Sequence, residues 1–414
     1  MPEPNQVPDV VSLDVEPGLT VLVASDIHFA PTRTEASAWA AEHLSARIRA
    51  IEGPAILVFA GDLVEAWAVM PADVPGALDA HPEFIAAVQD FASQSDRQVY
   101  VLPGNHDGRL GWSSDDDHAV AERLHAKVAF AIELALRVDD ADRRVRIEHG
   151  HRFDPSNAFH DPRNPDDTPL GQHVVQELLP DIRSRPNSTF LDGVESLFDP
   201  RSIVSFVTSR IFYRRVLGRL WWFLVPLGLV IGLRLLWAVG IVADDDQKLS
   251  PFAEQLLWLD VLAVIFLSLM VLVAYFVLNR AWSAASTVMA EQRGKSQNDL
   301  ARQAAGKMIG DGFDGLVSGH THCAELSAVD GGFYGNSGSG VKSVMPVRAH
   351  FRLPHVYVPH IQVSWIELDT TPTGWHVHLL DGWREVGGTT ALERRFARRQ
   401  FPHPSDPSEV ATYP

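Results

Sequence analysis

The segment VLVASDIH at residues 21–28 decides the fold, because a short apolar run ends there in a carboxylate and an imidazole. Four further segments repeat this arrangement: AILVFAGD at 55–62, VYVLPGNHD at 99–107, VRIEHGH at 145–151 and GLVSGHTH at 315–322. Short runs rich in branched apolar residues are typical of buried β-strands. We therefore expect loops at the C-terminal ends of strands to bring these polar groups to one place.

The spacing within the polar clusters predicts a metal site. Asp26 and His28 lie two residues apart, so at one strand end both side chains can point to the same face, and His320 and His322 repeat this spacing. Oxygen and imidazole ligands together suit Mn, Fe, Zn or Co. The alternative is a set of buried core histidines and turn residues, which five such clusters in this order disfavour.

The five clusters together resemble the DxH, GD, GNHD, histidine-loop and GHxH pattern of the calcineurin-like metallophosphoesterase superfamily. The resemblance extends from Val21 to His322 but leaves out a long insert. It implies an α/β fold of the four-layer αββα sandwich type and a centre of two divalent ions, with manganese among the candidates. Carried over residue by residue, the implied metal ligands are Asp26, His28, Asp62, Asn105, His149, His320 and His322, with Asp62 shared by the two ions.

The same resemblance implies that His106 is a proton donor or phosphate stabiliser and not a metal ligand. Two cations about 3.5–4 Å apart can activate a bridging water for attack on phosphorus, and the leaving group then needs a proton. Asp107 either orients His106 or caps a turn, and His151 either supports a ligand or contacts substrate. Further candidate substrate contacts, for which surface loop positions are the alternative, are Arg152, Asn157, His160, Arg163 and Asn336.

The insert between HGH and GHTH contains two apolar runs, at residues 220–243 and 256–278. Each reaches the roughly 20 residues that cross a bilayer, and tryptophans lie toward the ends of the runs. Basic residues flank the pair of runs, whereas the connecting loop is acidic. The sequence therefore predicts a two-helix transmembrane hairpin in the cell membrane, with the catalytic domain and both termini cytoplasmic. Buried core helices of a large soluble protein are the alternative.

Two charged residues lie within these apolar runs. Arg234 interrupts the first run and Asp260 the second. Because an unpaired charge in a membrane is costly, we expect the two side chains to pair across the hairpin. Contact of Arg234 with a lipid phosphate is the alternative.

Composition narrows the compartment and the partners. The single cysteine, Cys323, permits no intramolecular disulfide, and the N-terminal residues show no signal peptide. A formal net charge of −17 disfavours sequence-independent nucleic-acid binding, which needs a basic surface. We expect no nucleic-acid partner.

The chain divides into four parts by pattern. Residues 1–155 and 311–390 are predicted to form the two halves of the catalytic domain, 156–310 the insert with a cap segment, and 391–414 a basic helix and a disordered tail. Strands and helices should alternate as βαβαβ through Val101, with a long helical segment over residues 115–136. The segments IQVSWIEL and WHVHLLDGW, at 361–368 and 375–383, should pair as a β-hairpin.

These features predict a membrane-anchored phosphohydrolase that cleaves a phosphomonoester or pyrophosphate bond of a lipid-linked or amphipathic substrate. GDLVEAW at residues 61–67 also resembles the GDLFEAW of UDP-diacylglucosamine pyrophosphatases. The chain departs from that group in GNHD, in HGH and in its insert. One alternative is a tethered phosphodiesterase or phosphatase for a soluble nucleotide or phosphoprotein. The other is a catalytically silent membrane scaffold.

Overall fold

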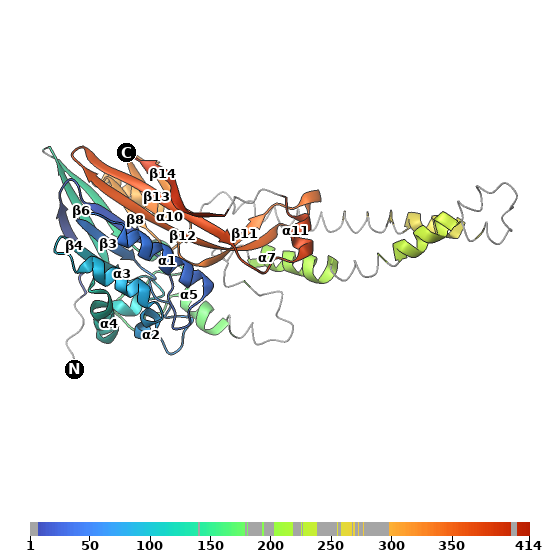
Figure 1. Ribbon diagram of the computed structural model, residues 1–414, viewed down its shortest axis with the longest axis horizontal. Helices are drawn as coiled ribbons and strands as arrows, with labels where there is room; N and C mark the ends of the chain where they lie inside the picture. The colour runs from blue at the N-terminus through green and yellow to red at the C-terminus, as the bar shows by residue number, and fades with distance from the viewer. Residues whose placement is uncertain are drawn as a thin grey trace.

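A computed structural model shows two β-sheets packed face to face, with helices on the outer faces (Figure 1). It describes residues 7–139, 141–178, 203–217, 227–237, 258–266, 298–398 and 404–414, with isolated residues between 180 and 276. The first sheet has the order β1 (Val11–Val15), β6 (Ala131–Val138), β7 (Ala141–Glu148), β8 (Gly315–Ser318), β10 (Gly332–Asn336), β9 (Glu325–Val329). The second has the order β14 (Ser405–Tyr413), β13 (Gly374–Glu385), β12 (Val356–Thr371), β2 (Thr20–Ala24), β3 (Ala55–Ala60), β4 (Arg97–Leu102), β5 (Lys127–Val128), and β11 (Lys342–Val347) pairs with β12.

The helices follow from local sequence signals. Thr34 caps the first long helix by accepting from the backbone N–H of Ser37, whose hydroxyl in turn accepts from the backbone N–H of Thr34. The helices are α1 (Glu35–Arg49), α2 (Val74–Asp79), α3 (Pro82–Ala92), α4 (Ser114–Leu124), α5 (Leu170–His173), α7 (Ile203–Arg210), α10 (Asp299–Gly310) and α11 (Ala391–Phe396). Shorter 3₁₀ and π turns are η1 (Gly108–Gly111), η2 (His151–Phe153), η3 (Val174–Leu178), η7 (Ile211–Leu217) and η8 (His350–Arg352).

Alternation along β2, β3 and β4 makes both faces of the second sheet apolar. Leu22, Leu57 and Val101 pack against helices α1 to α4, whereas Val23 and Val58 point into the space between the sheets. These side chains are essentially inaccessible to water, and each contributes about 1.5–3 kcal/mol by burial. With α10 on the outer face of β8 and β10, the result is the predicted αββα sandwich.

Strand direction sets where the polar loops meet. β2, β3 and β4 are parallel in the second sheet, and β7 and β8 are parallel in the first, so five C-terminal strand ends come together. Backbone hydrogen bonds join the loops. The N–H of Asp26 donates to the carbonyl of Gly61, and the N–H of Gly319 donates to the carbonyl of His149. The expected βαβαβ order and the β12–β13 hairpin are both confirmed.

The described base of the insert packs on the C-terminal part of the chain. Helix α7 lies beside β12 and close to α11 (Figure 1). Arg210 of α7 lies 3.3 Å from the carboxylate of Glu393 in α11, and both side chains are buried. The Tyr213 hydroxyl donates to the carbonyl oxygen of Pro354. This segment is therefore joined to the catalytic domain by polar contacts as well as by apolar packing.

The predicted transmembrane hairpin is corrected by the structure. Helical residues described within the two apolar runs span 227–237 and 258–266, and the rest of both runs lies mostly outside the described residues. Over the part of the chain that is described, no helix combines the length and apolar character needed to cross a bilayer. This finding contradicts the prediction of a two-helix cell-membrane protein with cytoplasmic termini, since a spanning helix needs roughly 20 apolar residues. The predicted pairing of Arg234 with Asp260 is confirmed, with 3.3 Å between Nε and Oδ2.

Two smaller predictions also fail. The segment 115–136 is not one helix: α4 ends at Leu124, His125 has left-handed backbone, and β5 and β6 follow. Apolar and polar residues alternate in AIELALRV, which favours a strand over a helix. The tail predicted to be disordered contains β14, which pairs antiparallel with β13. An unpaired strand edge accepts such an addition even from a polar segment.

Candidate metal centre

Left-handed backbone conformations turn the ligand-bearing loops inward. Asp26, His28, Asp62, His320 and His322 all have φ between 52° and 72°. Non-glycine residues rarely adopt this region, and when they do they cluster at functional sites. Gly61 has φ of 91°, and a Cβ there would collide with the ring of His149. The glycine of the GD pair is thus required for the close approach of two predicted ligands.

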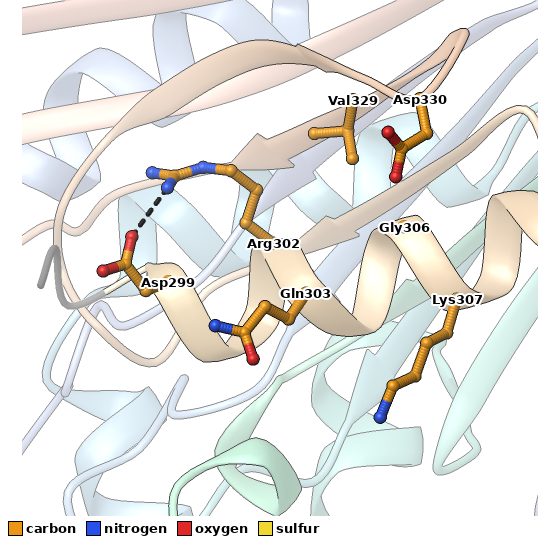
Figure 2. Close-up of a pocket in the computed structure, with 7 residues that line it drawn as sticks. All are labelled: Asp299, Arg302, Gln303, Gly306, Lys307, Val329 and Asp330. Carbon is orange, nitrogen blue, oxygen red and sulfur yellow. Dashed lines mark hydrogen bonds and ion pairs between the residues drawn. The ribbon is translucent and has the colours of Figure 1, made fainter.

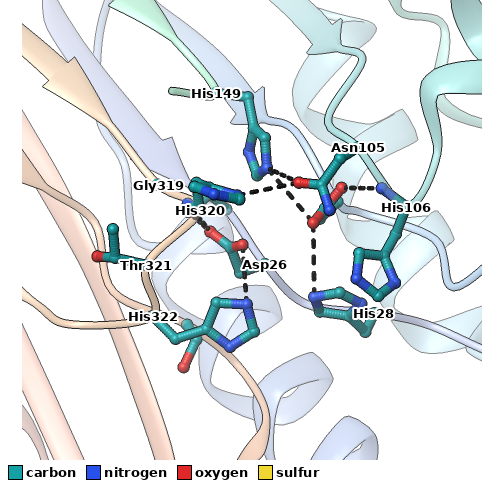
Figure 3. A network of polar contacts seen from close by, with 12 residues as sticks. Asp26, His28, Asn105, His106, His149, Gly319, His320, Thr321 and His322 are labelled. Carbon is teal, nitrogen blue, oxygen red and sulfur yellow. Dashed lines mark hydrogen bonds and ion pairs between the residues drawn. The ribbon is translucent and has the colours of Figure 1, made fainter. Parts of the chain in front are cut away.

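The first group of predicted ligands surrounds Asp26 and Asp62, which are both buried (Figure 3). Asp26, His28 and His322 offer ligand atoms within 4.8 Å of one another. Nε2 of His322 lies 3.1 Å from Oδ1 of Asp26, and Nε2 of His28 lies 3.7 Å from Oδ2 of Asp62. Residues almost 300 positions apart therefore meet in one cluster.

The second group lies on the other side of Asp62. Nε2 of His149 is 3.3 Å from Oδ2 of Asp62 and 3.0 Å from Oδ1 of Asn105. Nδ1 of His320 is also 3.0 Å from that amide oxygen. Asp26, Asp62 and His149 form a further group with the spacing of a metal site. All seven predicted ligands are brought together, with Asp62 between the two groups.

The residues present fit divalent ions. Nε2 of His28 is buried without a hydrogen bond, although it faces the carboxylate of Asp62. A buried polar atom without a hydrogen-bond partner costs free energy unless another group binds it. Burial would raise the pKa of Asp62, but the neighbouring His149 and His106 hold it well below its usual range, so the site presents an ionised carboxylate. Imidazole and carboxylate donors in this number suit Mn, Fe, Zn or Co.

Glu65 joins the metal cluster to His106. Its carboxylate lies 2.9 and 3.0 Å from Nδ1 of His106 and 3.1 Å from Nδ1 of His28. It also accepts from the backbone N–H groups of Trp67 and Ala68, each at 2.8 Å. Although burial would raise the pKa of Glu65, His106 and His28 hold it well below its usual range. Glu65 is therefore an anion that fixes Nδ1–H on both rings and leaves each Nε2 directed away from it.

Glu65 was not among the residues predicted from the sequence, although GDLVEAW contains it. The signal available was its position three residues after Asp62, close enough for both to act from one loop. Trp67 was also missed. Its ring stacks on His106 with centroids 4.2 Å apart and limits the positions that the imidazole can adopt.

Asp107 serves the alternative role considered for it, that of a turn cap. Its carboxylate accepts from the backbone N–H groups of Gly104, Asp62 and Leu63, at 2.7, 3.2 and 2.8 Å. The prediction that it orients His106 is wrong, since Glu65 contacts Nδ1 of that ring. Burial and the charge of Asp62 raise the pKa of Asp107 to about 6. Asp107 thus holds the GD and GNHD loops together.

Two other predicted residues, Asn157 and Asn336, support the ligands from behind, the first through Asp154, which was not predicted. Asp154 accepts from Nε2 of His320 at 3.1 Å, and Asn157 donates to Asp154 at 2.7 Å. Asn336 is fully buried and donates to the carbonyl oxygen of Gly319 at 2.7 Å. Asn157 and Asn336 therefore contact the framework of the site and not its open side.

The remaining candidates differ in their distance from the cluster. The ring of His151 lies 5.3 Å from that of His149, which makes His151 a neighbour of the ligands. Arg152 pairs with Glu148 at 2.8 Å. The exposed His160 contacts Asp167, and Arg163 contacts Asp9 at 2.7 Å near the N-terminal end. The structure does not bring these last two residues to the metal cluster.

Comparison with known proteins finds a similarity to one family over part of the chain. The model of the calcineurin-like phosphoesterase family matches residues 19–210, which contain the first four of the five motifs. No curated protein matches the chain. Among solved structures, a single-mutant form of Vps29 from Entamoeba histolytica matches with 10% identity and a TM-score of 0.28, covering 89% of this chain and 98% of that one. Phosphopantetheinyl hydrolase (PptH) from Mycobacterium tuberculosis matches with 13% identity and a TM-score of 0.27, covering 79% and 92%.

Proposed function

We propose that the chain, whose residues 19–210 match the calcineurin-like phosphoesterase family, is a metallophosphoesterase that hydrolyses a phosphomonoester or pyrophosphate bond at a centre of two divalent ions. The convergence of seven ligand-type side chains from five loops supports this proposal. Asp26, His28, Asp62 and His322 would hold one ion. Asp62, Asn105, His149 and His320 would hold the other.

The bound ions would supply an activated water and neutralise charge on the phosphoryl oxygens. The protein's own part is to keep the ligand atoms in place and to deliver a proton. Asp107 fixes the two loops that carry Asp62 and Asn105, and Asp154 fixes His320. Each of these supports limits the number of arrangements that the ligands can adopt.

The contact between Glu65 and His106 is the observation that carries the catalytic part of the proposal. With Nδ1–H held by Glu65, Nε2 of His106 is the atom available to the leaving oxygen. A protonated imidazole donates a proton near neutral pH, and such general-acid catalysis typically contributes 10²–10⁴-fold. His106 would therefore protonate the leaving group as the bond to phosphorus breaks.

A hydrolysis screen with matched variants tests the proposal. Purified protein would be supplied with Mn, Fe, Zn or Co and offered monoesters, lipid pyrophosphates and nucleotides. We expect Asn105→Ala to lose bound metal, measured by elemental analysis. His106→Ala should keep the metal and lose about 10²–10⁴-fold in turnover. Wild-type turnover in His106→Ala would reject its assigned role.

The same screen separates the substrate classes. A lipid-linked substrate predicts much faster turnover of lipid pyrophosphates than of nucleotides. Preference for a nucleotide would favour the alternative of a phosphatase or phosphodiesterase for soluble substrates. Bound metal without hydrolysis of any phosphoester would favour the scaffold alternative.

A further inference from the structure

A cavity of about 540 Å³ opens beside the predicted metal ligand His28. It lies between the first turn of α1, the loop that carries His28, and the ends of β11, β12 and β13. Its volume falls within the roughly 300–1,000 Å³ of small-ligand pockets. Because His28 forms part of its wall, a molecule that occupies the cavity reaches the edge of the proposed metal centre.

Five of the ten side chains in the wall of this cavity are apolar, namely Ile27, Ala36, Val341, Ile361 and Val386, and apolar atoms make up most of its accessible surface. Two glycines, Gly340 and Gly387, also line the cavity. The surface offered to a ligand is therefore mainly hydrocarbon. Such a surface gains free energy from burying an apolar group and none from burying a charged one.

The polar side chains of the wall are His28, Thr34, Glu35, Ser37 and Lys342, and three of them are bound to side chains outside the metal site. Thr34 and Ser37 bond to each other in the cap of α1. Glu35 pairs with Arg384 at 3.0 Å. These three side chains therefore need no partner from a ligand, which leaves His28 and Lys342 as the polar side chains of the wall that can contact the phosphorylated part of a substrate.

A second cavity, of about 580 Å³, provides a contrast. Figure 2 shows it along α10, where Arg302, Asp299 and Lys307 line it together with Asp330. Its lining is charged and includes none of the seven predicted metal ligands. Of these two cavities, the one beside His28 combines a mainly apolar surface with contact to the site.

We propose that the cavity beside His28 binds an apolar alkyl or aryl group of the phosphorylated substrate. This inference rests on the proposed function, because it assumes that the phosphate of the substrate lies at the metal ligands, and His28 is one of these ligands. The substrate class is then a phosphate ester or anhydride whose organic part carries a hydrocarbon group. The cavity selects substrates by that group and leaves the chemical step to the metal centre and His106.

Binding of alkylphosphonates of increasing chain length tests the inference. These compounds keep the anionic head group but cannot be hydrolysed as esters. Their dissociation constants would be measured by calorimetry on the metal-loaded protein, from ethyl- to decylphosphonate. We expect about fourfold tighter binding for each added methylene until the cavity is full, the factor that corresponds to about 0.8 kcal/mol per buried CH₂. Equal affinity across the series would overturn the inference.

Two variants place the effect in this cavity. A Cβ added at Gly387 meets no atom within 4 Å, and this residue does not have left-handed backbone, so Gly387→Phe fits without backbone strain. Ala36→Met fills the opposite wall. Both should abolish most of the chain-length dependence, whereas Gly310→Phe, which also meets no neighbour, should keep it. An unchanged dependence in both filled variants would overturn the inference.

Failure of the proposed function would look different. In that case the metal-loaded wild-type protein would not hydrolyse p-nitrophenyl phosphate. The affinity of the alkylphosphonates would still rise with chain length if the cavity binds their alkyl groups. Hydrolysis together with a flat binding series would instead reject the cavity and retain the phosphohydrolase.

Discussion

Replacing Glu65 with glutamine should reverse the proton positions on two histidines. In the structure the carboxylate accepts from Nδ1 of His106 and of His28 and from two backbone N–H groups. A glutamine oxygen would stay with the backbone donors, which would turn its NH₂ group toward the rings. Each Nδ1 would then accept, and the ring proton would move to Nε2.

The magnitude follows from the hydrogen bonds that are lost. A hydrogen bond to a charged group contributes about 1.5–3 kcal/mol, which corresponds to roughly 10- to 150-fold in rate if His106 depends on it in the transition state. The same change places a proton on Nε2 of His28, the atom that faces Asp62. We therefore also expect metal affinity to fall by about 10–100-fold, as for other groups that orient metal ligands.

Two substrates separate these effects. At saturating metal, Glu65→Gln should lose about 10- to 150-fold in kcat for an alkyl phosphate, whose leaving group needs a proton. Its loss for p-nitrophenyl phosphate, whose leaving group needs none, should be less than about threefold. Glu122→Gln, at an exposed glutamate, is the matched control. Equal losses for the two substrates would refute the reasoning that Glu65 acts through the proton on His106.

Four other predictions concern stability. Adding Mn²⁺ at 100 times its dissociation constant should stabilise the fold by about 2.7 kcal/mol. This stabilisation should appear as a rise in Tm that a chelator removes. An unchanged Tm would contradict binding of Mn²⁺ to the folded state. Asp107→Leu should cost about 1–3 kcal/mol in urea unfolding, because it leaves buried backbone N–H groups without an acceptor. Burial lowers the pKa of His81 to about 4, so its neutral form stabilises the fold above pH 6.5 and this contribution is lost as the pH falls toward 4. His81→Phe should therefore flatten the pH dependence of stability in that window, by up to about 1.4 kcal/mol per pH unit, and a parallel profile would argue against it. Arg210→Met should destabilise by about 2 kcal/mol because Glu393 stays buried with one partner fewer, whereas Arg137→Met, in an exposed pair, should have little effect.

The insert shows how an interpretation from sequence can fail. Apolar runs at residues 220–243 and 256–278 satisfy a length criterion, but a criterion on composition does not say how many residues are helical. Among the described residues, no helix is both long enough and apolar enough to cross a bilayer. The pairing of Arg234 with Asp260 was predicted correctly because opposite charges in apolar surroundings are attracted wherever the helices lie.

The assignment of Asp107 shows a different limit. Adjacency to His106 suggested contact, yet the carboxylate of Asp107 accepts from backbone N–H groups of its own turn and of the GD loop. Glu65 is 41 positions from His106 in the chain and contacts it directly. Only the packing of β3 beside β4 brings these two loops together.

The sequence indicated the sandwich fold and the seven ligand-type residues through the resemblance of its five motifs to a known superfamily, because short motifs are local and each carries its own chemical signature. Tertiary structure decided which acid holds His106, which candidate contacts lie away from the site, and where an apolar cavity meets His28. These features depend on distances between loops that are far apart in the chain, and such distances are set by sheet register and side-chain packing, which no local pattern records.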